Sequence, residues 1–224
     1  MEENNIKMEK PNASITMTTK TLFQTFTPKF FWFDCETTGL SPQLNDIWQI
    51  AFKIVIGGEV VAAHKFECRP TNMNTDRLSP EALAIGGVTP EYLAELPPSA
   101  HILRAIQDIL KNYMDKFNRS DKLIPAGYKV CDFDVPFLRE FFKKCGDKYY
   151  GSFFSNYPVD VYYMILACHA ACGIQHPKYK LVDMCELYGV PLDHAHDALS
   201  DITATEKIFA LLKDLYFRPQ PITF

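Results

Sequence analysis

The segment FFWFDCE, from Phe30 to Glu36, constrains the fold of this chain more than any other. Its nearly continuous apolar run is typical of a central strand that is buried on both faces of a sheet. Side chains two residues apart in a strand point to the same face, so we expect Asp34 and Glu36 to lie side by side at the strand's end. Divalent cations would offset the cost of burying these charges, and oxygen ligands suit Mg²⁺ or Mn²⁺. The alternative is that the strand ends at Phe33 and that both acids are solvated loop residues.

The rest of the sequence predicts further strands and several helices. Residues 48–56 place large apolar side chains at every second position, and Gly57-Gly58 predicts a hairpin to a returning strand at 59–68. Two more strands are predicted at 121–128 and 157–160. Capping signals and apolar spacing predict helices at 79–84, 89–94, 99–117, 134–145, 161–173, 179–189 and 197–216. This order predicts a mixed sheet with helices packed against it.

An acid begins the helix that is predicted from residue 134. Asp134 lies three and four residues before Phe137 and Leu138, and these offsets share one helix face. An acid on the inward face is an unusual place for a solvated charge. The alternative is that Asp134 merely caps the helix.

The final predicted helix repeats this feature. Asp201 lies three residues after Ala198 and four before Thr205, so it belongs to the apolar stripe of the helix. His196 lies just before the helix, and both side chains are expected to face one site. Taken alone, they would be interpreted as an exposed histidine and a helix-start acid.

Three motifs, in chain order, point to a known family. FDCETTGL, FDVPFL and HDALSD resemble the three sequence blocks of the DEDDh 3′-to-5′ exonucleases, the family of the proofreading subunit of bacterial replicative DNA polymerase. The similarity spans about residues 29–216. The resemblance implies an α/β protein with the ribonuclease-H-like fold, a five-stranded mixed sheet flanked by helices. It also implies two Mg²⁺ (or Mn²⁺) ions held by Asp34, Glu36, Asp134 and Asp201, with His196 as the general base.

The same resemblance implies a set of contacts to the substrate. The turn after Glu36 would meet the terminal nucleotide, with Leu40 packed on its base, and Lys129, at a position that is often asparagine in the family, would approach a phosphate. Phe137 is a stacking candidate, although its place on a helical stripe favours core packing. The predicted substrate-binding residues are Thr37, Thr38, Gly39, Leu40, Phe137 and Lys129.

The predicted function is metal-dependent 3′-5′ exonuclease activity that releases nucleoside 5′-monophosphates from single-stranded nucleic acid or a frayed 3′ end. DNA is slightly favoured, because the motif pattern is closest to the proofreading group. Two alternatives remain open: an exoribonuclease of the same family that trims RNA 3′ ends, and a binding module that kept the fold but lost turnover. The net charge of −4 argues against a generally basic nucleic-acid binder, but two divalent ions would cancel four acids locally. No motif identifies a polymerase or another replication or repair partner.

The chain is expected to form one domain at 28–217, with a flexible extension at 1–27 and a tail at 218–224. No apolar run reaches the roughly 18 residues of a membrane span, and the N-terminus lacks the apolar region of a secretory signal. We therefore expect a cytoplasmic protein without membrane association.

Seven irregularly spaced cysteines argue against a disulfide framework. One crowded group, Cys168, His169, Cys172 and His176, raises the alternative of a zinc site. Paired C-x-x-C spacing is absent there, so core packing of the cysteines is the favoured interpretation.

Overall fold

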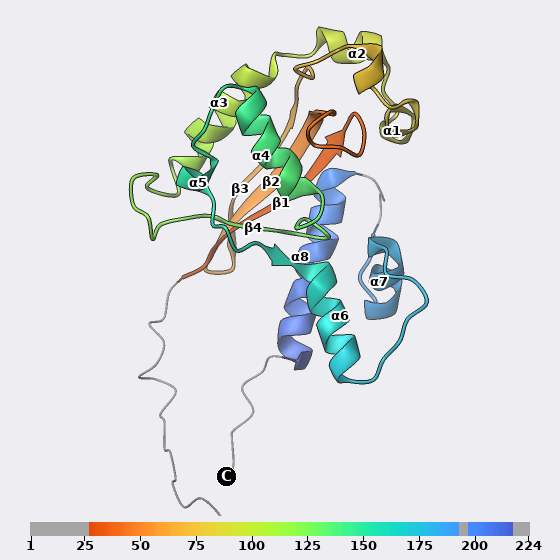
Figure 1. The fold of residues 1–224 in the computed structure, drawn as a ribbon. Helices are drawn as coiled ribbons and strands as arrows, with labels where there is room; N and C mark the ends of the chain where they lie inside the picture. The colour runs from red at the N-terminus through yellow and green to blue at the C-terminus, as the bar shows by residue number, and fades with distance from the viewer. Residues whose placement is uncertain (1–26, 193–196, 217–224) are drawn as a thin grey trace, which may run out of the picture.

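The computed structural model describes residues 27–192 and 197–216. Within them, five strands form one mixed sheet in the order β3-β2-β1-β4-β5 (Figure 1). β1 pairs antiparallel with β2, and β2 with β3, whereas β4 runs parallel to β1 and β5 parallel to β4. The predicted α/β class, a five-stranded mixed sheet flanked by helices, is confirmed. The strands span Lys29–Thr37 (β1), Ile47–Ile56 (β2), Glu59–Glu67 (β3), Ile124–Gly127 (β4) and Val159–Asp160 (β5).

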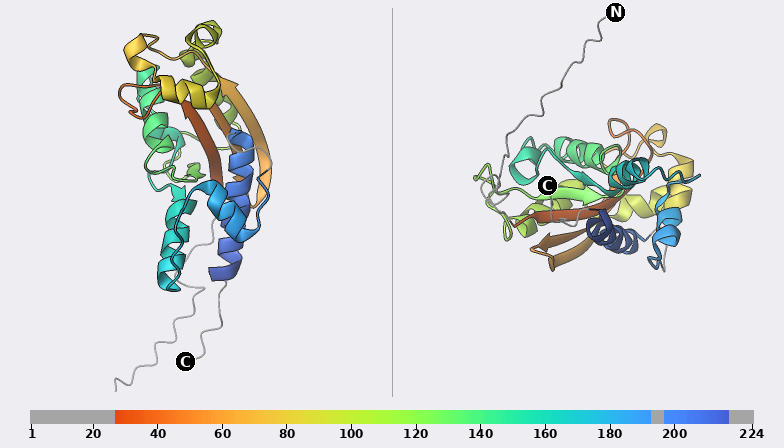
Figure 2. Two further views of the ribbon diagram at one scale, coloured as in Figure 1. Left: turned by 90° about the vertical axis from the view of Figure 1, so that its right-hand side faces the viewer. Right: turned by 90° about the horizontal axis from the view of Figure 1, so that it is seen from below.

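Helices cover both faces of this sheet (Figure 2). α3, α4 and α5 pack on one face and α6, α7 and α8 on the other, while α1 and α2 pack around Trp48 at the start of β2. None of the helices in the described residues is long and apolar enough to cross a membrane. The helices span Pro80–Gly86 (α1), Pro90–Glu95 (α2), Ser99–Leu110 (α3), Asp134–Lys144 (α4), Tyr150–Phe153 (α5), Val161–Ala171 (α6), Leu181–Tyr188 (α7) and Ala198–Tyr216 (α8), with a 3₁₀ turn at Thr75–Arg77.

β1 is buried from both sides because each face of the strand meets a different group of helices. Phe31 and Phe33 are almost completely buried in the core that includes α3 and α4. Trp32 faces the other way, toward α6 and α8, where its ring centroid lies 5.3 Å from that of Phe209. Burying an apolar side chain of this size stabilises the fold by about 1.5–3 kcal/mol. The continuous apolar run therefore reflects a strand without a solvent face.

One helix is shorter than the sequence predicts. The apolar spacing predicted a helix at 99–117, but α3 ends at Leu110 and a series of turns follows. The Asp115 carboxylate accepts the N–H of Phe117 at 2.9 Å, and such local bonds compete with helical ones. Met114 is nevertheless buried, so the apolar spacing continues into a packed turn.

The predicted domain at 28–217 contains every element described above. The predicted extension at 1–27 and tail at 218–224 lie outside the described residues, except for Thr27.

β1 and β4 separate toward their carboxyl ends. Their pairing stops at Trp32 and Ala126, so beyond this point β1 is paired only with β2. A Cβ at Gly127 would lie 2.3 Å from the Val130 side chain and 2.9 Å from the carbonyl oxygen of Phe33, so this position requires glycine. In open α/β sheets, ligands bind in crevices outside the carboxyl ends of the strands. The functional site is therefore expected at this end of β1.

Replacing Gly127 by alanine is expected to destabilise the protein by about 1–3 kcal/mol, because the added methyl group overpacks the junction of β1 and β4. Gly151→Ala is the matched control: a Cβ at Gly151 meets no atom within 4 Å, and alanine is the better helix former in α5. Urea unfolding of both variants and the wild type measures the change in the free energy of unfolding. An unchanged value for Gly127→Ala would contradict the close approach described here.

Candidate active site

The two acids of β1 lie on the part of the strand that extends beyond β4. Because β1 continues to Thr37, the alternative that Asp34 and Glu36 are loop residues is wrong. Both acids are only partly exposed. The period of two places them on the strand face of Trp32, which is the face covered by α6 and α8.

Asp134 approaches β1 from α4. It is the first residue of the helix and is 4% exposed. Its Oδ1 accepts the main-chain N–H of Cys35 at 3.0 Å, on the edge of β1 that β4 does not cover. No side-chain hydrogen bond caps α4. The alternative of a helix cap is therefore wrong for Asp134, whose carboxylate ties the helix to the strand.

Asp34 lies at the centre of an acidic cluster. Burial raises the pKa of its carboxyl group well above the usual range, and the charges of Asp134, Glu36, Asp201 and Asp197 raise it further, in that order. Asp201 belongs to the first turn of α8. Because charges interact strongly only at short range, acids from three distant segments must converge here. The structure thus brings the four predicted acids together, and their assignment as metal ligands stays a prediction.

The same crowding acts on Asp134. Burial raises the pKa of its carboxyl group to about 7, the hydrogen bond from Cys35 opposes this rise, and the charges of Glu36 and Asp160 add to it. Without a compensating cation, the cluster therefore tends to retain protons near neutral pH. A bound divalent ion would be the largest local charge and would favour the ionised carboxylates.

The chemistry of the donor set fits such an ion. All four candidates are carboxylates, and Mg²⁺ and Mn²⁺ prefer oxygen ligands. Among the described residues alone, no three His, Cys, Asp or Glu side chains form a group that could hold a metal ion. Mg²⁺ usually takes only one or two protein carboxylates and completes its shell with water and substrate phosphate, so an incomplete protein cage is consistent with it.

His196, the predicted general base, lies outside the described residues. The next residue, Asp197, is described and contributes to the raised pKa of Asp34. Its Oδ2 accepts the N–H of Ser200 at 3.1 Å, which caps the start of α8. Asp197 therefore contributes its charge to the acidic cluster and caps α8.

Thr38 stabilises the turn after β1 through hydrogen bonds to main-chain oxygens inside the protein. Its main-chain N–H donates to the carbonyl oxygen of Asp46 at 2.9 Å, and its hydroxyl donates to the carbonyl oxygen of Arg77 at 3.0 Å. The residue is completely buried. The prediction that Thr38 binds the substrate is therefore corrected: its N–H and its hydroxyl are already bonded inside the protein.

Exposure separates the remaining substrate candidates. Leu40 is 83% exposed, whereas Thr37 is buried and its hydroxyl donates to the carbonyl oxygen of Gly39 at 2.7 Å. A Cβ at Gly39 would lie 2.5 Å from the Asn45 side chain, so packing within the loop already requires this glycine. Phe137 is 1% exposed and belongs to the core, so the prediction that it stacks on a base is wrong.

Lys129 occupies an unusual backbone conformation. Its φ is 59°, in the left-handed region that glycine and asparagine adopt most readily. The conformation is held by Asp160, a buried acid whose carboxylate accepts the N–H groups of Lys129 at 3.0 Å and Cys131 at 2.9 Å. The exposed ammonium group lies 4.5 Å from the ring centroid of Tyr162. The sequence interpretation missed this role of Asp160, although its position before α6 is a capping signal.

Residues 31–209 match the exonuclease family RNase_T. This match covers most of the sequence. The chain belongs to this exonuclease family. The DEDDh family resemblance that the three motifs predicted is therefore confirmed.

Several relatives place the exonuclease domain within longer proteins. It is 28% identical over 186 residues to DNA polymerase III PolC-type of Streptococcus pyogenes serotype M2 (strain MGAS10270), covering 81% of this chain and 11% of that protein. It is also 28% identical over 214 residues to exodeoxyribonuclease I of Buchnera aphidicola subsp. Acyrthosiphon pisum (strain APS), covering 85% of this chain and 47% of that protein. The chain thus spans less than half the length of these relatives.

Solved structures show the same architecture. The zinc-bound complex of E. coli ExoI with single-stranded DNA superimposes with a TM-score of 0.71 at 23% identity, over 86% of this chain and 42% of that one. At this identity the likeness concerns the fold alone, and it confirms the predicted ribonuclease-H-like fold.

The exonuclease domain does not assemble the zinc group considered from the sequence. The ring nitrogens of His169 lie 3.2 Å and 2.9 Å from the hydroxyls of Tyr179 and Tyr188. Cys168 is buried, whereas Cys172 is exposed. Among the described residues, these side chains form no metal-binding group. The interpretation of Cys168 as a core residue is supported instead.

The raised pKa of Asp134 predicts a pH dependence of stability in the metal-free protein. Because the folded-state pKa of about 7 exceeds that of an unfolded aspartate, the folded state binds the proton more tightly, and stability is lost as the pH rises from about 4 to 7. The free energy of unfolding of Asp134→Asn should therefore rise relative to that of the wild type as the pH increases across this window. The size of the pKa shift corresponds to a difference of up to roughly a few kcal/mol.

Urea unfolding in EDTA, at about pH 4.5 and 8, measures this difference. Asp132→Asn is the control, because Asp132 is exposed two residues away and its carboxylate accepts the Tyr163 hydroxyl at 2.6 Å. A difference between Asp134→Asn and the wild type that does not change with pH would contradict the buried acidic cluster.

Proposed function

We propose that this chain is a metal-dependent 3′-5′ exonuclease domain that releases nucleoside 5′-monophosphates from single-stranded or frayed DNA 3′ ends. The observation that carries the proposal is the convergence of Glu36, Asp134 and Asp201 on Asp34. These acids come from the three motifs of an exonuclease family and lie at the open end of β1. A buried cluster of this charge is costly unless cations occupy it.

In this mechanism, Asp34, Glu36, Asp134 and Asp201 would hold two Mg²⁺ or Mn²⁺ ions. Such ions, when bound, activate a water and stabilise the leaving 3′-oxygen. His196 would take the proton of the attacking water, because an imidazole has its pKa close to the working pH. The water oxygen bonds to phosphorus as the bond to the 3′-oxygen breaks, which leaves a 5′-monophosphate and a new 3′-hydroxyl.

The substrate end would meet the loop after β1. Leu40 supplies an exposed apolar side chain in the loop that follows Glu36, suited to packing on the terminal base. Lys129 would contact a backbone phosphate, and Thr37 and Gly39 would support the shape of the loop that presents Leu40. Stacking and phosphate contacts tolerate any sequence, as a trimming enzyme needs.

DNA is the favoured substrate, because the relatives carry the names DNA polymerase III PolC-type and exodeoxyribonuclease I. Discrimination against RNA would depend on a contact to the 2′-hydroxyl group. A silent binding module is the weaker alternative, because the chain retains all four acids and His196. A cytoplasmic location stays a prediction, and no polymerase or repair partner is assigned.

Digestion of end-labelled single-stranded DNA, duplex DNA and RNA in Mg²⁺ tests the proposal. A ladder that shortens from the 3′ end of single-stranded DNA is expected, and it should disappear in EDTA. If RNA is digested faster than DNA, the protein is instead the exoribonuclease of the first alternative. A gel shift without digestion would identify the binding module.

Alanine at Asp34, Asp134 or Asp201 is expected to reduce digestion by more than about 100-fold, because even groups that only support a metal ligand are typically worth 10–100-fold. Asp132→Ala is the matched control: it removes an exposed acid two residues from Asp134. Single-turnover digestion in Mg²⁺ gives the rates. Wild-type rates in any of the three alanine variants would remove that acid from the site.

Lys129→Asn is expected to weaken DNA binding while preserving or slightly raising stability. Asparagine tolerates the left-handed backbone at this position, but the substitution removes one phosphate contact. Fluorescence anisotropy with an Asp34→Ala background should give a salt dependence of binding that is shallower by roughly 0.7 per lost contact on single strands. Lys111→Asn, directly after the end of α3, serves as the control, and equal slopes for both variants would exclude Lys129 from the interface.

A further inference from the structure

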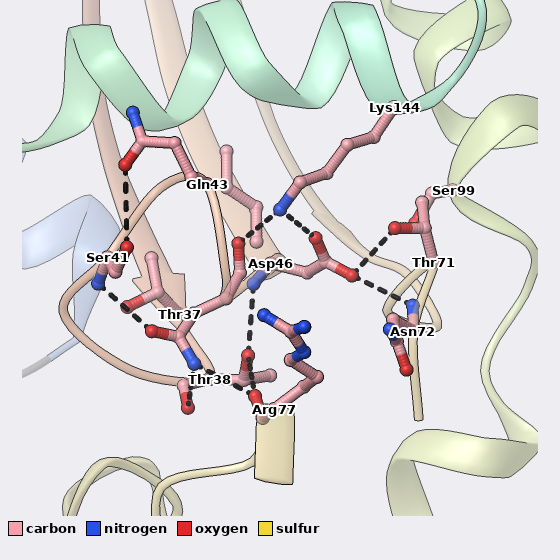
Figure 3. Close-up of polar contacts among 12 residues, drawn as sticks. Thr37, Thr38, Ser41, Gln43, Asp46, Thr71, Asn72, Arg77, Ser99 and Lys144 are labelled. Atoms are coloured by element: carbon pink, nitrogen blue, oxygen red, sulfur yellow. Dashed lines mark hydrogen bonds and ion pairs between the residues drawn. The ribbon is translucent and has the colours of Figure 1, made fainter. Parts of the chain in front are cut away.

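Helix α4 is fastened to the sheet region at both of its ends. At the first residue, Asp134 accepts the N–H of Cys35 in β1 at 3.0 Å. At the last residue, the Lys144 ammonium donates to the Asp46 carboxylate at 2.6 Å and to the carbonyl oxygen of Asn45 at 2.6 Å (Figure 3). Ten residues, or about 15 Å of helix, separate these two attachments.

Asp46 is a buried anchor and not a surface acid. It is 5% exposed, and Lys144 forms its ion pair. Its second oxygen accepts the Thr71 hydroxyl at 2.8 Å and the N–H of Asn72 at 3.0 Å. The charge is therefore both paired and hydrogen-bonded, which is the condition under which a buried carboxylate is tolerated.

Asp46 also closes the loop that follows β1. The Asp46 carbonyl oxygen accepts the N–H of Thr38, and the Asp46 N–H donates to the Thr38 hydroxyl at 3.0 Å. The Asn45 side chain donates to the Arg77 carbonyl oxygen at 2.9 Å. Exposed Leu40 lies on this loop. One ion pair thus joins the end of α4 to the loop that carries Leu40.

We propose that Lys144 is a positioning residue for the metal-dependent reaction. Its ion pair with Asp46 fixes α4 along its axis, and therefore Asp134 at the acidic cluster, and it holds the 38–46 loop against β1. The inference rests on the proposed function, because it assigns to Lys144 an effect on metal and DNA binding. A displacement of about 1 Å at a reacting group costs up to 10²-fold in rate, so a remote tether of this kind has a measurable effect.

Lys144→Met tests the tether. We expect Mn²⁺ binding, measured by calorimetry without DNA, to weaken by about 10-fold, as for other groups that support a metal ligand. The KM for a short DNA oligonucleotide should rise in parallel. Lys143→Met is the matched control, since the neighbouring Lys143 pairs with Glu140 on the surface of α4, and it should leave both quantities unchanged.

A second variant separates positioning from simple stability. Lys144→Met leaves the Asp46 charge buried and unpaired, whereas Asp46→Asn with Lys144→Met removes both charges and keeps an acceptor for Thr71 and Asn72. The double variant should recover the melting temperature but not the Mn²⁺ affinity. It also carries the test if Lys144→Met alone does not fold.

If the double variant recovers the wild-type Mn²⁺ affinity together with the melting temperature, the positioning role is overturned. That result differs from failure of the proposed function, in which the wild-type protein itself shows no metal-dependent digestion.

Discussion

The repulsion between carboxylates around Asp34 is the constraint on which the rest of this structure depends. Isolated acids of this number would separate or stay protonated, and here both burial and neighbouring charges raise the pKa of the central group. Other contacts in the fold must therefore offset this repulsion. Each acid belongs to a helix or strand that is held in place by contacts outside the cluster.

The anchors are lysines and main-chain donors at a distance from the cluster. On the α8 side, Lys53 of β2 binds Glu206 at 2.8 Å, and Lys65 of β3 binds Asp197 at 3.1 Å. The second pair is exposed and contributes about 0–1 kcal/mol at most, so its main effect is on geometry. Together with the apolar contacts of α8 on β1, these pairs hold the first turn of the helix over the strand. The loss of stability caused by the acidic cluster is thus offset by packing and pairing around it.

Local sequence was sufficient for the strands, because apolar periodicity predicts them. Each acid interrupts an apolar face, but Asp34 and Asp134 taken alone also fitted a loop residue and a helix cap, and only the three motifs together favoured one shared site. Local sequence could not predict the supporting contacts, because Asp160 accepts the N–H of Cys131, 29 residues away, and Asp46 pairs with Lys144, 98 residues away. For Phe137 the helical stripe favoured core packing, and the packing of α4 on the sheet confirms this interpretation against the stacking role.

The arrangement of β1 also gives the protein an internal optical probe. The sequence contains two tryptophans, and Trp32 lies two residues before Asp34 on the same strand face, against Phe209 of α8. Trp48 lies in the separate cluster beneath α1 and α2. In a Trp48→Phe background, emission would come from the indole next to the acids alone. Ion loading could then be followed by intrinsic fluorescence, without a label and without turnover.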